Sequence, residues 1–179
     1  PEHLETLVEP FESAEADSLL GWSYSNLDEI DSAGNLVTQS VLHSLGASHP
    51  KTSAFDCVAR DMLILPSSSL ISKSALHAVG AFDERLVGYE DDDLFLRLFR
   101  KGYRSRYIDR ALTKWRIHTT STSFSERMRT SIDKFRSMRF IACFARNGRR
   151  QTGWHQPTRP HERFDLVRRS KLRCRDLLP

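Results

Sequence analysis

Residues 90–102 hold the pattern that most restricts how this chain can fold. Four consecutive acids open the segment, a glycine closes it, and four apolar residues recur between them at helical spacing: Leu94, Phe95, Leu98 and Phe99. Acids favour the positive end of a helix, and glycine favours the position after its last turn. The pattern therefore predicts an amphipathic helix that runs to Lys101. Its apolar face has to be buried, and a chain of 179 residues is long enough to provide a core.

Helical and strand patterns alternate along the rest of the chain, which is typical of an α/β domain. We expect helices over residues 4–16, 73–79 and 124–146. The first of these contains Pro10, which should kink or break it. We expect strands over residues 19–25, 36–42, 62–65, 103–108 and 112–118, and a turn at residues 31–35.

Charge is distributed very unevenly along the chain. Residues 1–50 carry nine Asp and Glu and no Lys or Arg, whereas residues 94–179 carry 23 Lys and Arg against six Asp and Glu. Such asymmetry indicates either an anionic partner near the C-terminal half or a solvated basic tail. Charge alone does not decide between these two interpretations.

The cysteines and the apolar runs exclude two classes of protein. Cys57, Cys143 and Cys174 are scattered and form no CxxC pair, which argues against a disulfide framework and against a cysteine zinc site. The longest apolar run, residues 140–145, has six residues, whereas a membrane span needs about 20. We therefore expect a protein of a reducing compartment, in the cytoplasm, without a membrane-spanning helix.

The four acids Glu90, Asp91, Asp92 and Asp93 carry the first functional hypothesis. One or two acids are enough to cap a helix, and four adjacent carboxylates repel one another, so the cluster favours a functional site. Neighbouring side chains in a helical turn diverge by about 100°, so the four cannot all face one point. A metal site, a general base and a clamp for a substrate hydroxyl all remain open. For Arg97, we expect an ion pair with the acids at the helix start.

Several ordered motifs in residues 1–123 resemble the second half of family 2 glycosyltransferases, which are GT-A-fold enzymes that use nucleotide sugars. The family's GGFDE turn, its acidic loop and helix, and its GY pair are similar to residues 80–84, 90–97 and 102–103. Its hairpin and its R.H..S.S signature are similar to residues 24–34 and 116–123. The acidic loop also resembles the GGEDDD segment of β-1,4-galactosyltransferases.

The resemblance implies roles for individual residues. Asp91 would be the catalytic base of an inverting transfer and would deprotonate the acceptor hydroxyl. Tyr89, Glu90 and Asp92 would orient the acceptor. His118 would contact the divalent metal or the diphosphate, and Arg116 would neutralise phosphate charge.

The resemblance also implies a partial GT-A fold with a mixed sheet flanked by helices. In the family, the nucleotide and its divalent metal, Mn²⁺ or Mg²⁺, are held by an earlier half that ends in a DxD motif. In the family this motif comes a few residues before a helix like the one that starts here, and no DxD precedes Leu4 in this sequence. We therefore expect a glycosyltransferase fragment without the donor half, inactive in isolation and prone to self-association through an open sheet edge.

The resemblance divides the chain into three parts: the glycosyltransferase half at 1–123, an amphipathic helical extension at 124–150 and a basic peripheral tail at 151–179. Expected partners are a nucleotide-sugar donor and a sugar or lipid-linked acceptor. The basic tail suggests peripheral contact with the inner face of the membrane. The alternative is a basic module that binds nucleic acid or an anionic surface without catalysis. No nucleic acid is expected as a partner, because no zinc-finger, RNP or helix-turn-helix pattern is present.

Overall fold

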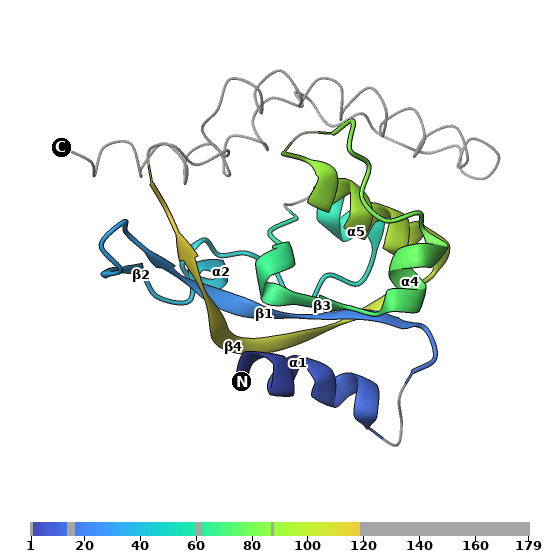
Figure 1. Cartoon of the computed structure of the whole chain (residues 1–179), viewed down its shortest axis with the longest axis horizontal. Coiled ribbons are helices and arrows are strands. Elements are labelled where there is room, and N and C mark those ends of the chain that lie inside the picture. Colours follow the sequence, from blue (N-terminus) through green and yellow to red (C-terminus); the bar gives the residue numbers. More distant parts are fainter. Residues whose placement is uncertain (1, 14–16, 60–61, 87, 119–179) are drawn as a thin grey trace.

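The structure, a computed structural model, describes residues 2–13, 17–59, 62–86 and 88–118. The described residues form a four-stranded sheet with α1 (Glu2–Glu12) on one face and α4 (Lys73–Ala78) and α5 (Glu90–Lys101) on the other (Figure 1). The short helices α2 (Val41–Ser44) and α3 (Ala54–Ala59) lie in the connection that follows the first hairpin. The expected α/β class and the mixed sheet flanked by helices are confirmed at this level.

The sheet is organised around one long strand, β1 (Leu20–Ile30). It pairs antiparallel with β2 (Leu36–Thr38) near its C-terminal end and with β3 (Ser69–Ile71) near its N-terminal end. On its other side it pairs parallel with β4 (Arg104–Arg116) along nearly its whole length. Because β1 is covered on both faces and both edges, nine of its 11 residues are buried.

The core between the sheet and α5 consists mainly of aromatic and leucine side chains. Trp22 and Tyr24 of β1 are fully buried, as are Leu94, Phe95 and Leu98 of α5. The ring of Trp22 lies 5.6 Å from that of Phe95 and 4.7 Å, edge to face, from that of Phe99. Burying each such side chain stabilises the fold by about 1.5–3 kcal/mol, so the apolar stripe predicted from sequence fixes α5 on the sheet.

The ends of α5 follow the predicted chemistry. The helix begins at Glu90, all four acids lie in its first turn, and Arg100 and Lys101 lie in its last. Gly102 follows with φ 95°, a left-handed conformation that glycine adopts without the cost that a Cβ would add. The amide of Gly102 donates to the carbonyl of Phe99, which caps the helix. The predicted helix is confirmed in type and at its C-terminal end, and its first turn includes all four acids.

The N-terminal helix is confirmed, but Pro10 does not break it. The helix continues through Pro10 to Glu12. Pro10 lacks a backbone amide, but it lies in the last turn, so few helical hydrogen bonds follow it. The hydroxyl of Ser23 donates to the carbonyl of Leu7 at 2.5 Å, which ties α1 to the sheet.

The predicted strand at residues 36–42 is correct only as far as Thr38, and α2 follows. The amide of Leu42 donates to Asn26 Oδ1 at 3.1 Å, and Val41 and Leu42 pack on Leu27. These long-range contacts select a helical turn for an apolar segment that fits a strand equally well on pattern alone. The predicted hairpin turn at residues 31–35 is confirmed by a hydrogen bond from the amide of Asp31 to the carbonyl of Asn35.

The predicted strand at residues 62–65 is wrong. This segment has no regular structure and is followed by the 3-10 turn η1 (Pro66–Ser68), and β3 (Ser69–Ile71) begins seven residues after the expected start. Leu63 has φ 42°, which an extended strand does not allow. Ile64 is nevertheless buried, so the apolar run supplies core contacts without supplying a strand.

The two strands expected at residues 103–108 and 112–118 are a single strand, β4. Its register with β1 shifts where Ser25 faces Ile108 and Asn26 faces Ala111, so Asp109 and Arg110 are taken up as an irregularity. The long β1 template makes this continuity possible. The helix expected at 124–146, the extension at 124–150 and the tail at 151–179 lie outside the described residues. Among the helices that the structure describes, none is long and apolar enough to cross a membrane.

Candidate functional site

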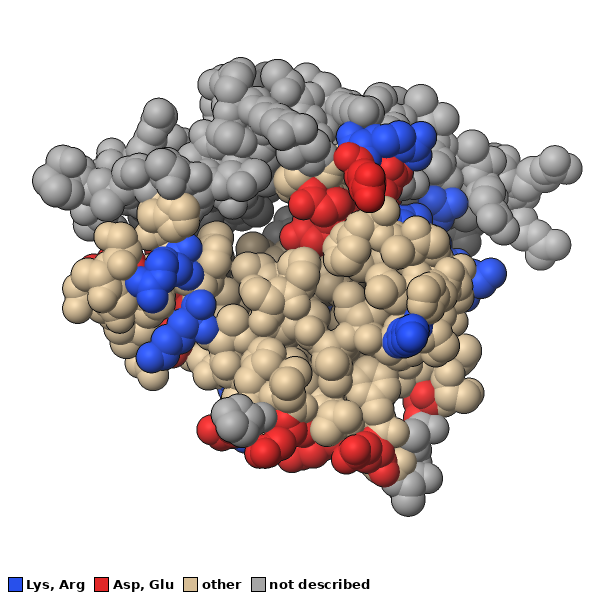
Figure 2. Space-filling model, viewed as in Figure 1, with Lys and Arg blue, Asp and Glu red and all other residues tan. Residues whose placement is uncertain are grey.

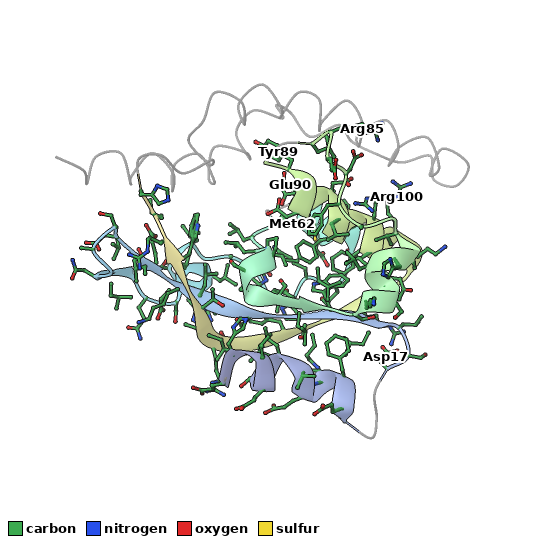
Figure 3. The ribbon with its side chains drawn as sticks, viewed as in Figure 1. Asp17, Met62, Arg85, Tyr89, Glu90 and Arg100 are labelled. Carbon is green, nitrogen blue, oxygen red and sulfur yellow. The ribbon has the colours of Figure 1, made fainter. Side chains whose placement is uncertain are left out.

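The acidic residues predicted as a site lie together at the start of α5. Figure 2 shows one group of Asp and Glu side chains above the centre of the molecule, and Figure 3 labels Tyr89 and Glu90 at the start of the helix. Tyr89 is the residue before the first helical turn, and its backbone carbonyl accepts from the amide of Asp93 at 3.1 Å. The expected acceptor-binding residues and the expected base therefore share one helix end.

The structure separates Asp93 from the other acids. Its side chain is fully buried and its Oδ2 accepts from Nε of Arg97 at 2.8 Å, one turn further along the helix. The same guanidinium donates through Nη2 to the carbonyl of Ala81 at 2.5 Å and through Nη1 to the carbonyl of Val79. The predicted pairing of Arg97 with the helix acids is confirmed. Arg97 also fastens the loop after α4 to the first turn of α5.

The other three acids are less deeply buried than Asp93. Glu90, Asp91 and Asp92 are partly buried, and Asp91 Oδ1 accepts from the amide of Asp92 at 2.9 Å. Oε2 of Glu90 is shielded from solvent and makes no hydrogen bond with any residue that the structure describes. A buried carboxylate oxygen without a donor is unfavourable by about 1–3 kcal/mol, so this atom is ready to accept a hydrogen bond from a ligand.

The cation in the loop before α5, Arg85, does not neutralise this cluster. Its guanidinium forms two parallel hydrogen bonds with Asp83, from Nε at 2.8 Å and from Nη2 at 2.7 Å. This pairing with Asp83 raises the pKa of Arg85, with a smaller contribution from the charge of Asp93. Both of these hydrogen bonds thus engage Arg85 with its own loop rather than with the first turn of α5.

Arg116 and His118, the expected phosphate and metal residues, lie at the other end of the described sheet. Nη1 of Arg116 donates to the carbonyls of Asp31 and Ser32, both at 2.9 Å, which braces the hairpin between β1 and β2. His118 is exposed, two residues beyond the end of β4. In Figure 1 this end of β4 and the first turn of α5 lie on the same side of the sheet but apart from each other. Both roles remain predictions.

A complete metal site is not formed by the described parts of the chain, because they contain no group of three His, Cys, Asp or Glu side chains that could hold an ion. Divalent metals of the expected kind need several oxygen or nitrogen ligands. The described residues do not fit a metal on their own, so no step proposed below is routed through one.

Sequence reasoning missed a buried polar network behind the site. The hydroxyl of Tyr24 accepts from the amide of Lys51 at 2.9 Å and lies 2.9 Å from Nδ1 of His49. Ser105 of β4 in turn donates to the carbonyl of Lys51 at 2.9 Å. Burial raises the pKa of Tyr24, so this phenol stays protonated. The network ties the connection between α2 and α3 to β1 and β4. No sequence motif predicts it, because its residues are far apart in the chain and come together only when the sheet forms.

Comparison with known proteins does not assign this arrangement to a family. No protein-family model matches the chain, and a search of curated proteins finds no match. The site is therefore interpreted from its own residues, together with the resemblance of its motifs described above.

Proposed function

We propose that this chain carries the acceptor-binding and catalytic-base half of a nucleotide-sugar glycosyltransferase, with Asp91 as the base. The proposal rests on how the acids in the first turn of α5 differ in their burial and partners. Asp93 is withdrawn into an ion pair with Arg97, whereas Oε2 of Glu90, directly before Asp91 in the first turn of α5, is shielded and has no donor among the described residues. A hydroxyl group is the simplest ligand that satisfies such oxygens, because it donates one hydrogen bond and then has a proton to lose.

In the proposed reaction, Asp91 accepts the proton of the acceptor hydroxyl as its oxygen attacks the anomeric carbon of the donor sugar. The new C–O bond forms as the bond from that carbon to the diphosphate oxygen breaks, and the bonding electrons leave with the nucleoside diphosphate. Configuration at the anomeric carbon is inverted. The unpaired Oε2 of Glu90 accepts from a second hydroxyl and orients the acceptor, as Asp92 and Tyr89 are also proposed to do.

The mixed sheet flanked by helices is compatible with this proposal. The assignment of that architecture to the GT-A fold is itself proposed. The donor nucleotide, the divalent metal and the roles of Arg116 and His118 are proposed from the motif resemblance alone. A metal bound beside the diphosphate would neutralise the charge that develops on the leaving group.

The proposal is tested by replacing the base in the protein that contains this chain. With UDP-, GDP- or dTDP-sugars, Mn²⁺ and a panel of saccharide acceptors, Asp91→Asn should lower nucleoside diphosphate release by about 100-fold or more, as expected for loss of a general base. Thermal unfolding should change little, because the asparagine side-chain oxygen can still accept the amide hydrogen bond of Asp92.

The matched control is Glu9→Gln, which neutralises an exposed acid on the opposite face of the sheet. This variant should retain wild-type transfer. Full turnover in Asp91→Asn, or no transfer with any of these donors and acceptors in the wild-type protein, would contradict the proposal.

A further inference from the structure

The loop between α4 and α5 borders an open depression of about 540 Å³ that has no role in the proposed reaction. Its volume lies within the range of small-molecule sites, about 300–1,000 Å³. Its lining includes Arg85 and Arg97 but none of the residues from Tyr89 to Asp93.

The floor of this depression is held rigidly. Arg97 lines it, and its guanidinium is fixed by Asp93 and by the carbonyls of Val79 and Ala81. Its side chain is only 18% exposed. Because three separate groups hold the guanidinium of Arg97 in place, this part of the depression keeps its shape.

Its rim combines an exposed aromatic ring with a hydrogen-bond acceptor and a hydrogen-bond donor. Phe82 is 42% exposed although most large apolar side chains of the described residues are buried. Glu84 is exposed and makes no hydrogen bond or ion pair with a described residue, so its carboxylate can accept. Arg85 uses Nε and Nη2 on Asp83, and among the described residues Nη1 has no acceptor, so it can donate.

Neither guanidinium group that lines the depression is left uncompensated, because Arg85 is paired with Asp83 and Arg97 with Asp93. The remaining charged group of the lining is Glu84. An anion would therefore meet no unpaired cation, and a single exposed carboxylate holds a cation only weakly, by about 0–1 kcal/mol. A neutral molecule with both hydroxyl donors and hydroxyl acceptors satisfies the polar groups, and an apolar C–H face fits against the negative face of an aromatic ring.

We propose that this depression binds a neutral sugar ring, stacked on Phe82 and hydrogen-bonded to Glu84 and Arg85. Its role as the subsite for a second sugar unit of the acceptor rests on the proposed function, whereas the binding itself does not. Arg97 fastens the loop that lines the depression to the helix that carries Asp91, so the two places are held in a fixed relation, and the proposed acceptor is a saccharide of two or more units that spans them. The acceptor class is accordingly a neutral oligosaccharide rather than a single sugar.

The test is a titration of the ¹⁵N-labelled chain with neutral disaccharides, followed by the amide shifts of residues 79–86. Binding should be weak, with a dissociation constant on the order of 1 mM, and it should saturate. Phe82→Ala should weaken it about tenfold, and Glu84→Gln should weaken it several-fold. The matched control, Phe55→Ala, removes another exposed phenylalanine, on α3 and 62% exposed, and should leave the affinity unchanged.

Three results would overturn the inference: no shifts in residues 79–86, equal affinities for Phe82→Ala and Phe55→Ala, or stronger shifts of the same amides with inorganic phosphate. Asp91→Asn separates this inference from the proposed function, because it should abolish transfer but keep the disaccharide shifts at residues 79–86. If those shifts persist while the wild-type protein transfers no sugar, the binding site stands and the proposed reaction fails. If transfer depends on Asp91 but Phe82→Ala binds normally, the reaction stands and the subsite fails.

Discussion

Arg97 offers the sharpest test of how the acidic helix end is built. Arg97→Ala removes the guanidinium that pairs with Asp93 and that holds the carbonyls of Val79 and Ala81. The carboxylate of Asp93, which is fully buried, then loses its cationic partner inside the protein. We expect this substitution to destabilise the fold far more than the loss of an ordinary surface charge.

The magnitude follows from the burial of the pair. Removing one partner of a buried ion pair typically destabilises a protein by about 3–5 kcal/mol, because the other charge is left without compensation. Arg97 is 18% exposed, so water can partly replace it, and the lower end of that range applies: about 3 kcal/mol. For a chain of this size the corresponding fall in melting temperature is about 6–12 °C.

The measurement is thermal unfolding followed by circular dichroism, with urea titration for the free energy of unfolding. Arg100→Ala is the matched control, since Arg100 lies in the same helix, is exposed and makes no ion pair with a described residue; it should cost less than about 0.5 kcal/mol. Arg97→Lys keeps a charge near Asp93 but cannot hold both carbonyls, so its loss should be intermediate. A melting temperature for Arg97→Ala equal to that of Arg100→Ala would refute the clamp.

Two further predictions concern the sheet. In Gly21→Ala the added Cβ would lie 2.8 Å from Cβ of Tyr103, so we expect a loss of about 1–3 kcal/mol in urea unfolding, and an unchanged midpoint would contradict this close approach. Burial raises the pKa values of Tyr24 and Tyr107 above the ordinary value of 10.0, so the stability that their neutral phenols contribute is complete below about pH 10 and falls as pH rises further. Absorbance at 295 nm should show that Tyr24→Phe and Tyr107→Phe each remove absorbance that appears at higher pH than for free tyrosine, and loss of absorbance at the pH of free tyrosine in both variants would disprove it.

The elements that sequence predicted best are those whose signals are local. The helix at residues 90–101 is defined by acids at one end, a glycine at the other and an apolar stripe between, and each signal acts within a few residues. The pairing of Arg97 with an acid four positions earlier is likewise a property of helix geometry. The hairpin turn was predictable because Asp31 and Asn35 bond to each other across it.

The predictions that failed concern apolar segments without such local signals. Residues 36–42 and 62–65 were both predicted as strands, yet the first segment ends as a strand at Thr38 and enters a helix at Val41, and the second is irregular. Their conformations follow from contacts with residues far away in the chain, such as the bond from Leu42 to Asn26. The division of β4 into two strands failed for the same reason, since its continuity comes from pairing with β1.

The site shows the same division. Sequence alone determined that four carboxylates would crowd one helix end, because their order in the chain places them in a single turn. Only the tertiary structure decided which of them is buried, because the partners of Asp93 include a guanidinium whose position depends on the loop after α4. It also decided that Oε2 of Glu90 lacks a donor among the described residues and that Phe82 stands exposed beside Arg85. Spacing along a chain fixes neighbours within a turn, whereas burial and long-range pairing exist only once separate elements pack together.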